Sequence, residues 1–235
     1  MKSKKEFDIK KTILPHTMVI AKLLDPYTAK LSRIMYNLGF TANLVTAIGF
    51  VLGVSSISTM LIFRNFWGLL AAAVLITLKN ITDTVDGKIA RGSDTLSPIG
   101  GFFDIISDWI FFHAAIFITI GYLTDHIVIG FLCVTGYMSR EFARRKFIYF
   151  YGEKATETNE AKKMSWIVFL VRRYDLGSSI WLTPVILLIS PVFLIYATVI
   201  IEYTLLIGEL GFDFLCLLRQ SREKKSNIER KINRI

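Results

Sequence analysis

Cysteine and histidine are scarce in this chain of 235 residues, which has two of the former and three of the latter. Both cysteines, Cys133 and Cys216, lie inside apolar stretches, so the sequence offers neither a disulfide framework nor a cysteine metal site. We interpret them as small buried hydrophobic residues. The sequence also lacks a repeat of about 20 to 50 residues and an inverted pair of broken helices, which are common in solenoid proteins and in transporters.

Long polar stretches are few as well. Hydrophobic residues make up 53% of the chain and its mean hydropathy is +0.49, which is too apolar for a soluble domain of this size. A helix of about 20 residues crosses a hydrocarbon core of about 30 Å. Apolar stretches of that order lie at 43–63, 66–85, 99–122, 127–148, 194–217 and, less sharply bounded, 177–192. We therefore count six membrane spans, with five as the alternative because Pro184 and Pro191 obscure the last boundary.

The residues before the first apolar stretch show a different pattern. From Lys22 to Tyr36, apolar residues alternate at helical spacing with Lys22, Lys30 and Arg33, which predicts an amphipathic helix in the membrane interface. An ordinary polar lead-in is the alternative. The predicted fold class is an all-α integral membrane protein with about six transmembrane helices and an N-terminal amphipathic interfacial helix. Its segments are 1–42, the cytoplasmic N-terminus with this helix, 43–218, the transmembrane domain, and 219–235, a basic cytoplasmic tail.

Acidic residues are outnumbered by basic ones, 19 against 28, and the net charge is +9. If both termini face the cytoplasm, Arg64 is the one basic residue that falls on the outer side of the membrane. The sequence therefore predicts a multi-pass protein with both termini cytoplasmic. Anionic lipid accounts for the positive charge, and without a recognition motif we expect no nucleic-acid partner.

Four aspartates stand at the junction of the second and third apolar stretches. Asp83 and Asp86 are three residues apart, and Asp104 and Asp108 are four apart, so each pair projects from one face of its helix. The two faces can place four carboxylates in one pocket. One such aspartate would usually be a helix cap or a salt-bridge partner, but Asp104 and Asp108 lie in a strongly apolar helix, where each costs about 2.5 to 3.5 kcal/mol on insertion scales.

Small residues accompany these aspartates. Gly87 and Ala90 share the helical stripe of Asp83, and Gly100 shares that of Asp104. Small residues let two membrane helices approach closely. We therefore expect Ala90 and Gly100 to be helix-packing positions at the site, where the second and third spans meet.

Four carboxylates crowded together in a medium of low dielectric constant require a cation, because they would otherwise be protonated. Ligation by oxygen alone favours Mg²⁺ or Mn²⁺ over Zn²⁺, since no cysteine is near and His113 is too far along its helix. Two such ions about 3.5 to 4 Å apart can clamp a diphosphate while a phosphoryl bond breaks. The sequence thus predicts metal-assisted phosphoryl transfer.

The stretch from Asp83 to Asp108 resembles the signature of the CDP-alcohol phosphotransferase family, Asp-x2-Asp-Gly-x2-Ala-Arg-x8-Gly-x3-Asp-x3-Asp, with every specified position matched. The resemblance implies a six-helix membrane fold, usually dimeric, with a cytoplasmic active site open to the bilayer. It also implies two metal ions bound through Asp83, Asp86, Asp104 and Asp108, with Asp108 as the base that deprotonates the acceptor hydroxyl.

A looser resemblance concerns the nucleotide. The family often has Pro-Asn-x-x-Thr where the first span begins, and this chain keeps Asn43 and Thr46 but has Ala42 for the proline. The resemblance implies contacts to the cytidine from Asn43 or Thr46, with helix capping by Asn43 as the alternative. Gly87 and Arg91 resemble positions that line the nucleotide pocket, although Arg91 can also be read as a basic anchor at the cytoplasmic surface.

The sequence does not decide which alcohol is the acceptor. The pair Arg140-Glu141 resembles phosphatidylglycerophosphate synthases, which belong to this family, but those enzymes usually read Asp-Pro-Leu-Ala-Asp-Lys where this chain reads Asp104-Ile-Ile-Ser-Asp108-Trp109. Glycerol 3-phosphate, inositol or its phosphate, serine and choline are all conceivable acceptors. CDP-diacylglycerol is the expected donor, because a site open to the membrane suits a lipid, and another CDP-alcohol is the alternative.

Two arginines are candidates for binding a phosphorylated acceptor. Arg140 and Arg144 are four residues apart and share a helix face, and guanidinium groups bind phosphate through two hydrogen bonds. Anchoring to lipid headgroups is the alternative for both. A different class of function, a cation channel or transporter with an acidic intramembrane site, would require ion flux without release of CMP.

Overall fold

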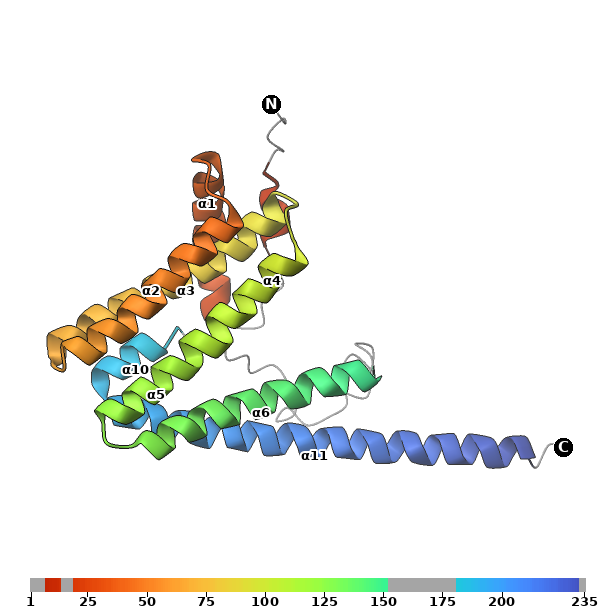
Figure 1. Cartoon of the computed structure of the whole chain (residues 1–235). Helices are drawn as coiled ribbons and strands as arrows, with labels where there is room; N and C mark the ends of the chain where they lie inside the picture. Colours follow the sequence, from red (N-terminus) through yellow and green to blue (C-terminus); the bar gives the residue numbers. More distant parts are fainter. Residues whose placement is uncertain (1–6, 14–18, 152–180, 233–235) are drawn as a thin grey trace. The chain divides into compact units, whose positions relative to one another are not determined.

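The computed structural model describes residues 7–13, 19–151 and 181–232, and within these ranges all regular structure is helical (Figure 1). The elements are the 3₁₀-helix η1 (Ile9–Thr12), α1 (Val19–Asn37), α2 (Ala42–Ile62), α3 (Phe66–Gly92), α4 (Pro98–Ile105), the π-helix η2 (Ile106–His113), α5 (Ala114–Leu123), α6 (Ile127–Tyr151), α10 (Thr183–Ile189) and α11 (Pro191–Ile232). The all-α class is confirmed.

The chain divides into two compact units. The first unit comprises Met1–Val134 with Asp175–Tyr196, and the second unit comprises Thr135–Tyr174 with Ala197–Ile235. Within the first unit, α3 contacts η1, α1, α2 and α10, and α2 also contacts α4, η2 and α5. The helix with the first two aspartates is therefore central to the first unit. The predicted segments 1–42, 43–218 and 219–235 stay a prediction.

Three helices in the described residues are long and apolar enough to cross a membrane. They are Ala42–Ile62, Phe66–Gly92 and Pro191–Leu215, and they match three of the expected spans. The expected span at 99–122 forms α4, η2 and α5 in succession, and the one at 127–148 lies within α6. Of the stretch 177–192, the part before residue 181 lies outside the described residues, and α10 covers much of the rest.

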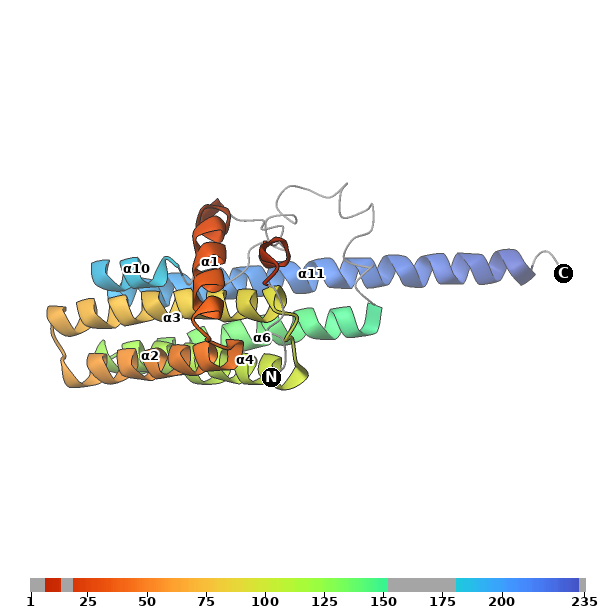
Figure 2. The ribbon, with the colours of Figure 1, turned by 90° about the horizontal axis from the view of Figure 1, so that it is seen from above.

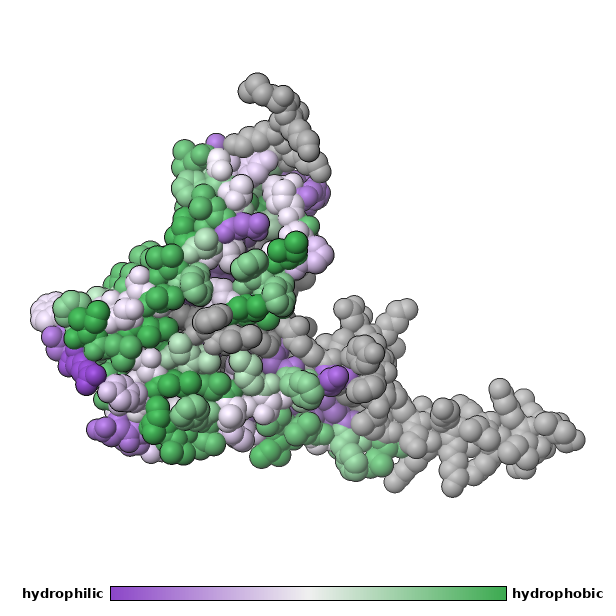
Figure 3. Space-filling model, in the orientation of Figure 1, coloured by the Kyte–Doolittle hydropathy of each residue, from purple (hydrophilic) through white to green (hydrophobic). Residues whose placement is uncertain are grey.

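The outer face of α2 is apolar. Val51 is 61% exposed and Ile62 is 70% exposed. Figure 3 shows hydrophobic residues gathered over α2, with hydrophilic ones at the turn into α3. Monomeric soluble proteins rarely expose large contiguous apolar surface. This face is therefore suited to contact with lipid.

Side-chain caps explain where the helices of the first unit begin. Thr41 accepts a hydrogen bond from Leu44 N at the start of α2, and Asn65 accepts one from Gly68 N at the start of α3. Ser97 caps α4, which opens with Pro98, a residue whose fixed φ suits the first helical turn. These caps fix the register of the helices that hold the aspartates.

The helix predicted from Lys22 to Tyr36 is present as α1, and Figure 2 shows it crossing α3. Leu23 and Tyr27 on its outer face are 64% and 74% exposed, whereas Thr28 and Ser32 on the opposite face are buried. The exposed side of α1 thus carries large apolar side chains. A helix is present where the sequence predicts one, and its amphipathic, interfacial character stays a prediction.

A buried ion pair fastens the N-terminal segment to the end of α3. Lys88 is 1% exposed, pairs with Asp25 of α1, and donates a hydrogen bond of 3.0 Å to the carbonyl oxygen of Thr12. Asp8 N also donates to the carbonyl oxygen of Gly92 at 2.9 Å. Because Lys88 lies between the two halves of the aspartate signature, this segment helps to fix the C-terminal end of α3.

Candidate active site

Three of the four predicted aspartates meet in space. Carboxylate oxygens of Asp83 from α3, Asp104 from α4 and Asp108 from η2 all lie within 4.8 Å of one another. The three side chains are half-buried. Such a cluster supplies oxygen donors from three helical segments to one point, which is the arrangement that a hard divalent cation requires.

The helix that holds Asp108 is not a regular α-helix. Residues Ile106–His113 form a π-helix between α4 and α5. The sequence predicts α-helical spacing between Asp104 and Asp108, whereas the wider π turn changes the directions of the residues that follow Ile105. Short π-helical stretches occur frequently at functional sites. Both aspartates nevertheless reach the same cluster.

A lysine that the sequence reasoning missed completes the cluster. Lys79 lies one helical turn before Asp83, and its Nζ is 3.6 Å from Asp83 Oδ1 and pairs with Asp108. Its side chain is buried, with the residue 3% exposed. The available signal was a lysine four residues before Asp83, inside an otherwise apolar run of a predicted span.

Asp86 is held separately. It is 5% exposed, and one of its carboxylate oxygens accepts a hydrogen bond of 2.7 Å from Thr46 Oγ1. Thr46 lies one turn into α2, so this bond joins α2 to α3. The structure thus brings Asp83, Asp104 and Asp108 together and places Asp86 against a residue that the sequence assigned to the nucleotide.

The other nucleotide candidates are Gly87 and Arg91, which belong to the signature, and Asn43. A Cβ added at Gly87 would be 3.3 Å from Arg91 Nη1, so Gly87 leaves room for this guanidinium. Asn43 is exposed at the start of α2. The alternative in which Asn43 caps the helix is wrong, because Thr41 is the cap.

The small residues near the aspartates have different neighbours. A Cβ added at Gly100 would be 3.4 Å from Asn43 Oδ1, so Gly100 lies against the start of α2 and not against α3. The close approach of α3 occurs elsewhere, since a Cβ added at Gly49 of α2 would be 2.7 Å from Thr82 Oγ1. Ala90 is half-buried near the end of α3. The helix-packing roles expected of Ala90 and Gly100 stay a prediction.

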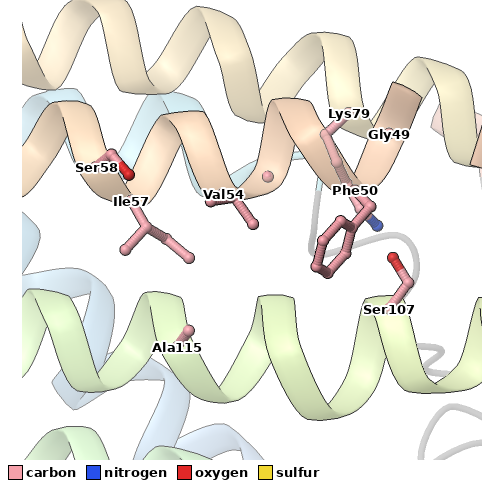
Figure 4. Close-up of a pocket in the computed structure, with 9 residues that line it drawn as sticks. Gly49, Phe50, Val54, Ile57, Ser58, Lys79, Ser107 and Ala115 are labelled. Atoms are coloured by element: carbon pink, nitrogen blue, oxygen red, sulfur yellow. The ribbon is translucent and has the colours of Figure 1, made fainter. Parts of the chain in front are cut away.

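An apolar cavity of about 120 Å³ adjoins the aspartate cluster. In Figure 4, Lys79 extends from α3 toward Ser107, the residue that precedes Asp108. From there the cavity follows one face of α2. Its lining residues are Gly49, Phe50, Gly53, Val54, Ile57, Ser58, Lys79, Ser107 and Ala115. The cavity therefore has a charged residue, Lys79, at the end next to the cluster, and a largely apolar wall along α2.

The arginines predicted to bind an acceptor lie on α6. In the second unit, Arg140 is 4% exposed, and its guanidinium lies 3.2 Å from Glu202 Oε2 and 3.3 Å from Glu209 Oε1, both on α11. Arg144 follows one turn later in α6, but its side chain lies outside the described residues. The binding of an acceptor phosphate by Arg140 and Arg144 stays a prediction, and the pairing of Arg140 with two glutamates is a feature that the sequence did not indicate.

Comparison with known proteins decides the family. The model of the CDP-alcohol phosphatidyltransferase family matches residues 40–210. The chain belongs to this family. It is also similar to Inner membrane protein YnjF of Escherichia coli (strain K12), with 33% identity over 89 residues, which are 38% of this chain and 41% of that protein. The chain thus spans less than half the length of this relative.

Membership in the CDP-alcohol phosphatidyltransferase family implies a divalent metal, and the donor set fits one. Asp83, Asp104 and Asp108 offer carboxylate oxygens within 4.8 Å of one another, and magnesium and manganese prefer such ligands. Asp86 is held by Thr46 on the neighbouring helix. The signature of the family therefore corresponds to a physical cluster and not to a pattern along the sequence alone.

Proposed function

We propose that this protein is a membrane transferase that moves a phosphoalcohol group from a CDP-alcohol, CDP-diacylglycerol in the first instance, to an acceptor alcohol with release of CMP, in phospholipid biosynthesis. The observation that supports this most strongly is the convergence of Asp83, Asp104 and Asp108 within 4.8 Å, at signature positions of the family to which the chain belongs.

The proposed metal ligands are Asp83, Asp86, Asp104 and Asp108, which would hold Mg²⁺ or Mn²⁺, with two ions as the family resemblance implies. When bound, these ions neutralise the diphosphate of the donor and stabilise the charge that develops on its oxygens. The role of the chain is to hold three carboxylates at one point and to fix the fourth through Thr46.

Asp108 is the proposed general base. Its carboxylate takes the proton of the acceptor hydroxyl as the acceptor oxygen forms a bond to the phosphorus that bears the donor alcohol. The bond from this phosphorus to the oxygen that it shares with CMP breaks, and CMP leaves. Positioned bases of this kind typically contribute about 10²- to 10⁴-fold to rate.

The nucleotide part of the donor is assigned to residues around the start of α2 and the end of α3. We assign cytidine contacts to Asn43 and Thr46 and phosphate or ribose contacts to Gly87 and Arg91. The support is proximity: Thr46 bonds Asp86, and Gly87 leaves room for the Arg91 guanidinium. Ala90 and Gly100 are assigned to helix packing, with Gly100 against α2.

The lipid nature of the donor is supported by the cavity. It adjoins the cluster at Lys79 and Ser107, and its other lining residues on α2 are largely apolar. An acyl chain that enters between helices from the bilayer would meet this surface while its headgroup reaches the aspartates. We place α1 in the interface, because Leu23 and Tyr27 on its apolar face are exposed.

The membrane topology and assembly follow from the sequence pattern. We propose six transmembrane helices, with both termini and the active site cytoplasmic, because the basic residues sort to that side. The protein is further proposed to act as a homodimer, as the family resemblance implies.

The acceptor is proposed to be a phosphorylated alcohol, as in a phosphatidylglycerophosphate synthase, with Arg140 and Arg144 as its phosphate ligands. The support is the spacing of four residues between them within α6, together with the affinity of guanidinium groups for phosphate. The two glutamates that pair with Arg140 provide a competing, purely structural role for it.

The test is an assay of CMP release by the purified protein in mixed micelles. CDP-diacylglycerol or a soluble CDP-alcohol is offered with glycerol 3-phosphate, inositol, inositol phosphate, serine or choline. The expected result is CMP release with CDP-diacylglycerol and a phosphorylated acceptor. Ion flux in proteoliposomes without CMP release from any pair would instead favour a channel or transporter.

A further inference from the structure

A buried ammonium group lies inside the acidic cluster. Lys79 is 3% exposed, pairs with Asp108, and lies 3.6 Å from Asp83 Oδ1. A lysine inside a membrane helix is costly unless it is paired, so its place here depends on the carboxylates that surround it. The benefit is mutual, because three carboxylates within 4.8 Å of one another repel and the ammonium offsets part of that repulsion.

The contacts of Lys79 are with the same carboxylates that fit a divalent cation. An ammonium group and a divalent cation that share Asp83 and Asp108 repel each other at a separation of a few Å, in surroundings where charges are poorly screened. Lys79 also lines the apolar cavity, and its side chain extends from α3 toward Ser107 (Figure 4).

We propose that Lys79 is a built-in counter-cation of the aspartate cluster, which competes with the divalent metal for Asp83 and Asp108 and thereby sets the metal concentration that the site requires. This inference rests on the proposed function for the metal itself. It predicts that the cluster without Lys79 binds metal more tightly and is less stable when metal is withheld.

The test compares the full-length wild type with Lys79→Met, which keeps the length of the side chain but removes its charge, and with Lys79→Arg, which keeps the charge. Binding of Mn²⁺ is measured by the electron paramagnetic resonance signal of the free ion, with no substrate present. The thermal unfolding midpoint is measured in detergent with excess EDTA and with saturating Mn²⁺.

Lys79→Met is expected to bind Mn²⁺ at least about tenfold more tightly than the wild type, since one positive charge has been removed beside the ion. Its unfolding midpoint in EDTA is expected to fall, and Mn²⁺ is expected to raise that midpoint by more than it does in the wild type. Lys79→Arg is expected to stay within about threefold of the wild-type affinity, because a charged group remains near the carboxylates.

Equal or weaker binding of Mn²⁺ by Lys79→Met, or the same gain in Lys79→Arg, would overturn the role of Lys79. If Lys79→Met does not fold, Lys79→Gln supplies the same comparison with a neutral side chain.

Asp108→Asn distinguishes a failure of the Lys79 proposal from a failure of the proposed function. If Asp108→Asn binds Mn²⁺ as the wild type does, the proposed metal site is wrong. If binding depends on Asp108 but not on the charge of residue 79, only the counter-cation role of Lys79 is wrong.

Discussion

Thr46 Oγ1 donates a hydrogen bond of 2.7 Å to a carboxylate oxygen of Asp86, although 40 residues separate the two in the sequence. The bond connects the first turns of α2 to the signature segment of α3. It fixes the direction of the one signature carboxylate that lies apart from the three-aspartate cluster. Asp86 is thus held toward α2, while the other three aspartates lie close to one another.

Thr46→Val tests this relationship. Valine keeps the shape of threonine but cannot donate, and a hydrogen bond to a charged group contributes about 1.5 to 3 kcal/mol. We expect kcat/KM for the CDP donor to fall about tenfold or more, with Thr46→Ser close to the wild type because it restores the hydroxyl. Wild-type kinetics in Thr46→Val would show that Asp86 needs no such support.

Lys88→Met tests how the N-terminal segment is anchored. The substitution leaves the buried carboxylate of Asp25 without its ammonium partner, and the loss of one member of a buried pair costs about 3 to 5 kcal/mol. We expect a clearly lower thermal unfolding midpoint in detergent. The double variant Lys88→Met with Asp25→Leu should recover much of the loss, because an apolar pair needs no counter-charge. A single variant as stable as the wild type would argue against a buried pair.

Ala115→Leu tests the cavity beside the cluster. Ala115 lines it, so a larger side chain should occupy space that we assign to an acyl chain of the donor. The KM for a long-chain CDP-diacylglycerol is expected to rise several-fold, with a smaller effect on a short-chain or soluble CDP-alcohol. Val74→Leu, on an exposed position of α3 outside the cavity, is the matched control. An equal effect on all donors would contradict the assignment of the cavity to an acyl chain.

Arg140→Ala separates the two roles proposed for this residue. If Arg140 binds the acceptor phosphate, the acceptor KM should rise about tenfold or more while the donor KM stays nearly unchanged. If its pairing with Glu202 and Glu209 is its whole role, the unfolding midpoint should fall and the acceptor KM should stay at the wild-type value. We expect the rise in acceptor KM, and Glu141→Gln, next to Arg140 in the chain, serves as a control for loss of charge nearby.

The aspartate cluster could be predicted because its geometry is largely local. Spacings of three and four residues place each pair on one helix face, and apolar stretches on both sides limit how the helices can meet. Helical spacing also places Lys79 on the face of Asp83, because it precedes Asp83 by one turn. The sequence does not reveal which carboxylate such a long side chain will reach. The π-helix that contains Asp108 could not be predicted either, because the wider turn has no clear sequence signal.

Contacts between distant segments were the least predictable. Arg140 pairs with Glu202 from 62 residues away, and Gly100 lies against Asn43 of α2 instead of against α3. These contacts depend on how helices pack, and the small residues that permit close packing are compatible with several partners. The sequence therefore predicts the spacing of residues along one helix more reliably than the contacts between helices.

The most direct measurement is the initial rate of CMP release from CDP-diacylglycerol by the purified protein, in Mg²⁺ or Mn²⁺ and in excess EDTA, for the wild type, Asp108→Asn and Asp94→Asn. Asp94 is exposed and outside the cluster, so its variant is the matched control. We expect activity that requires the metal, a rate about 10²- to 10⁴-fold lower in Asp108→Asn, and a nearly unchanged rate in Asp94→Asn. Undiminished release in excess EDTA, or a wild-type rate in Asp108→Asn, would contradict the account.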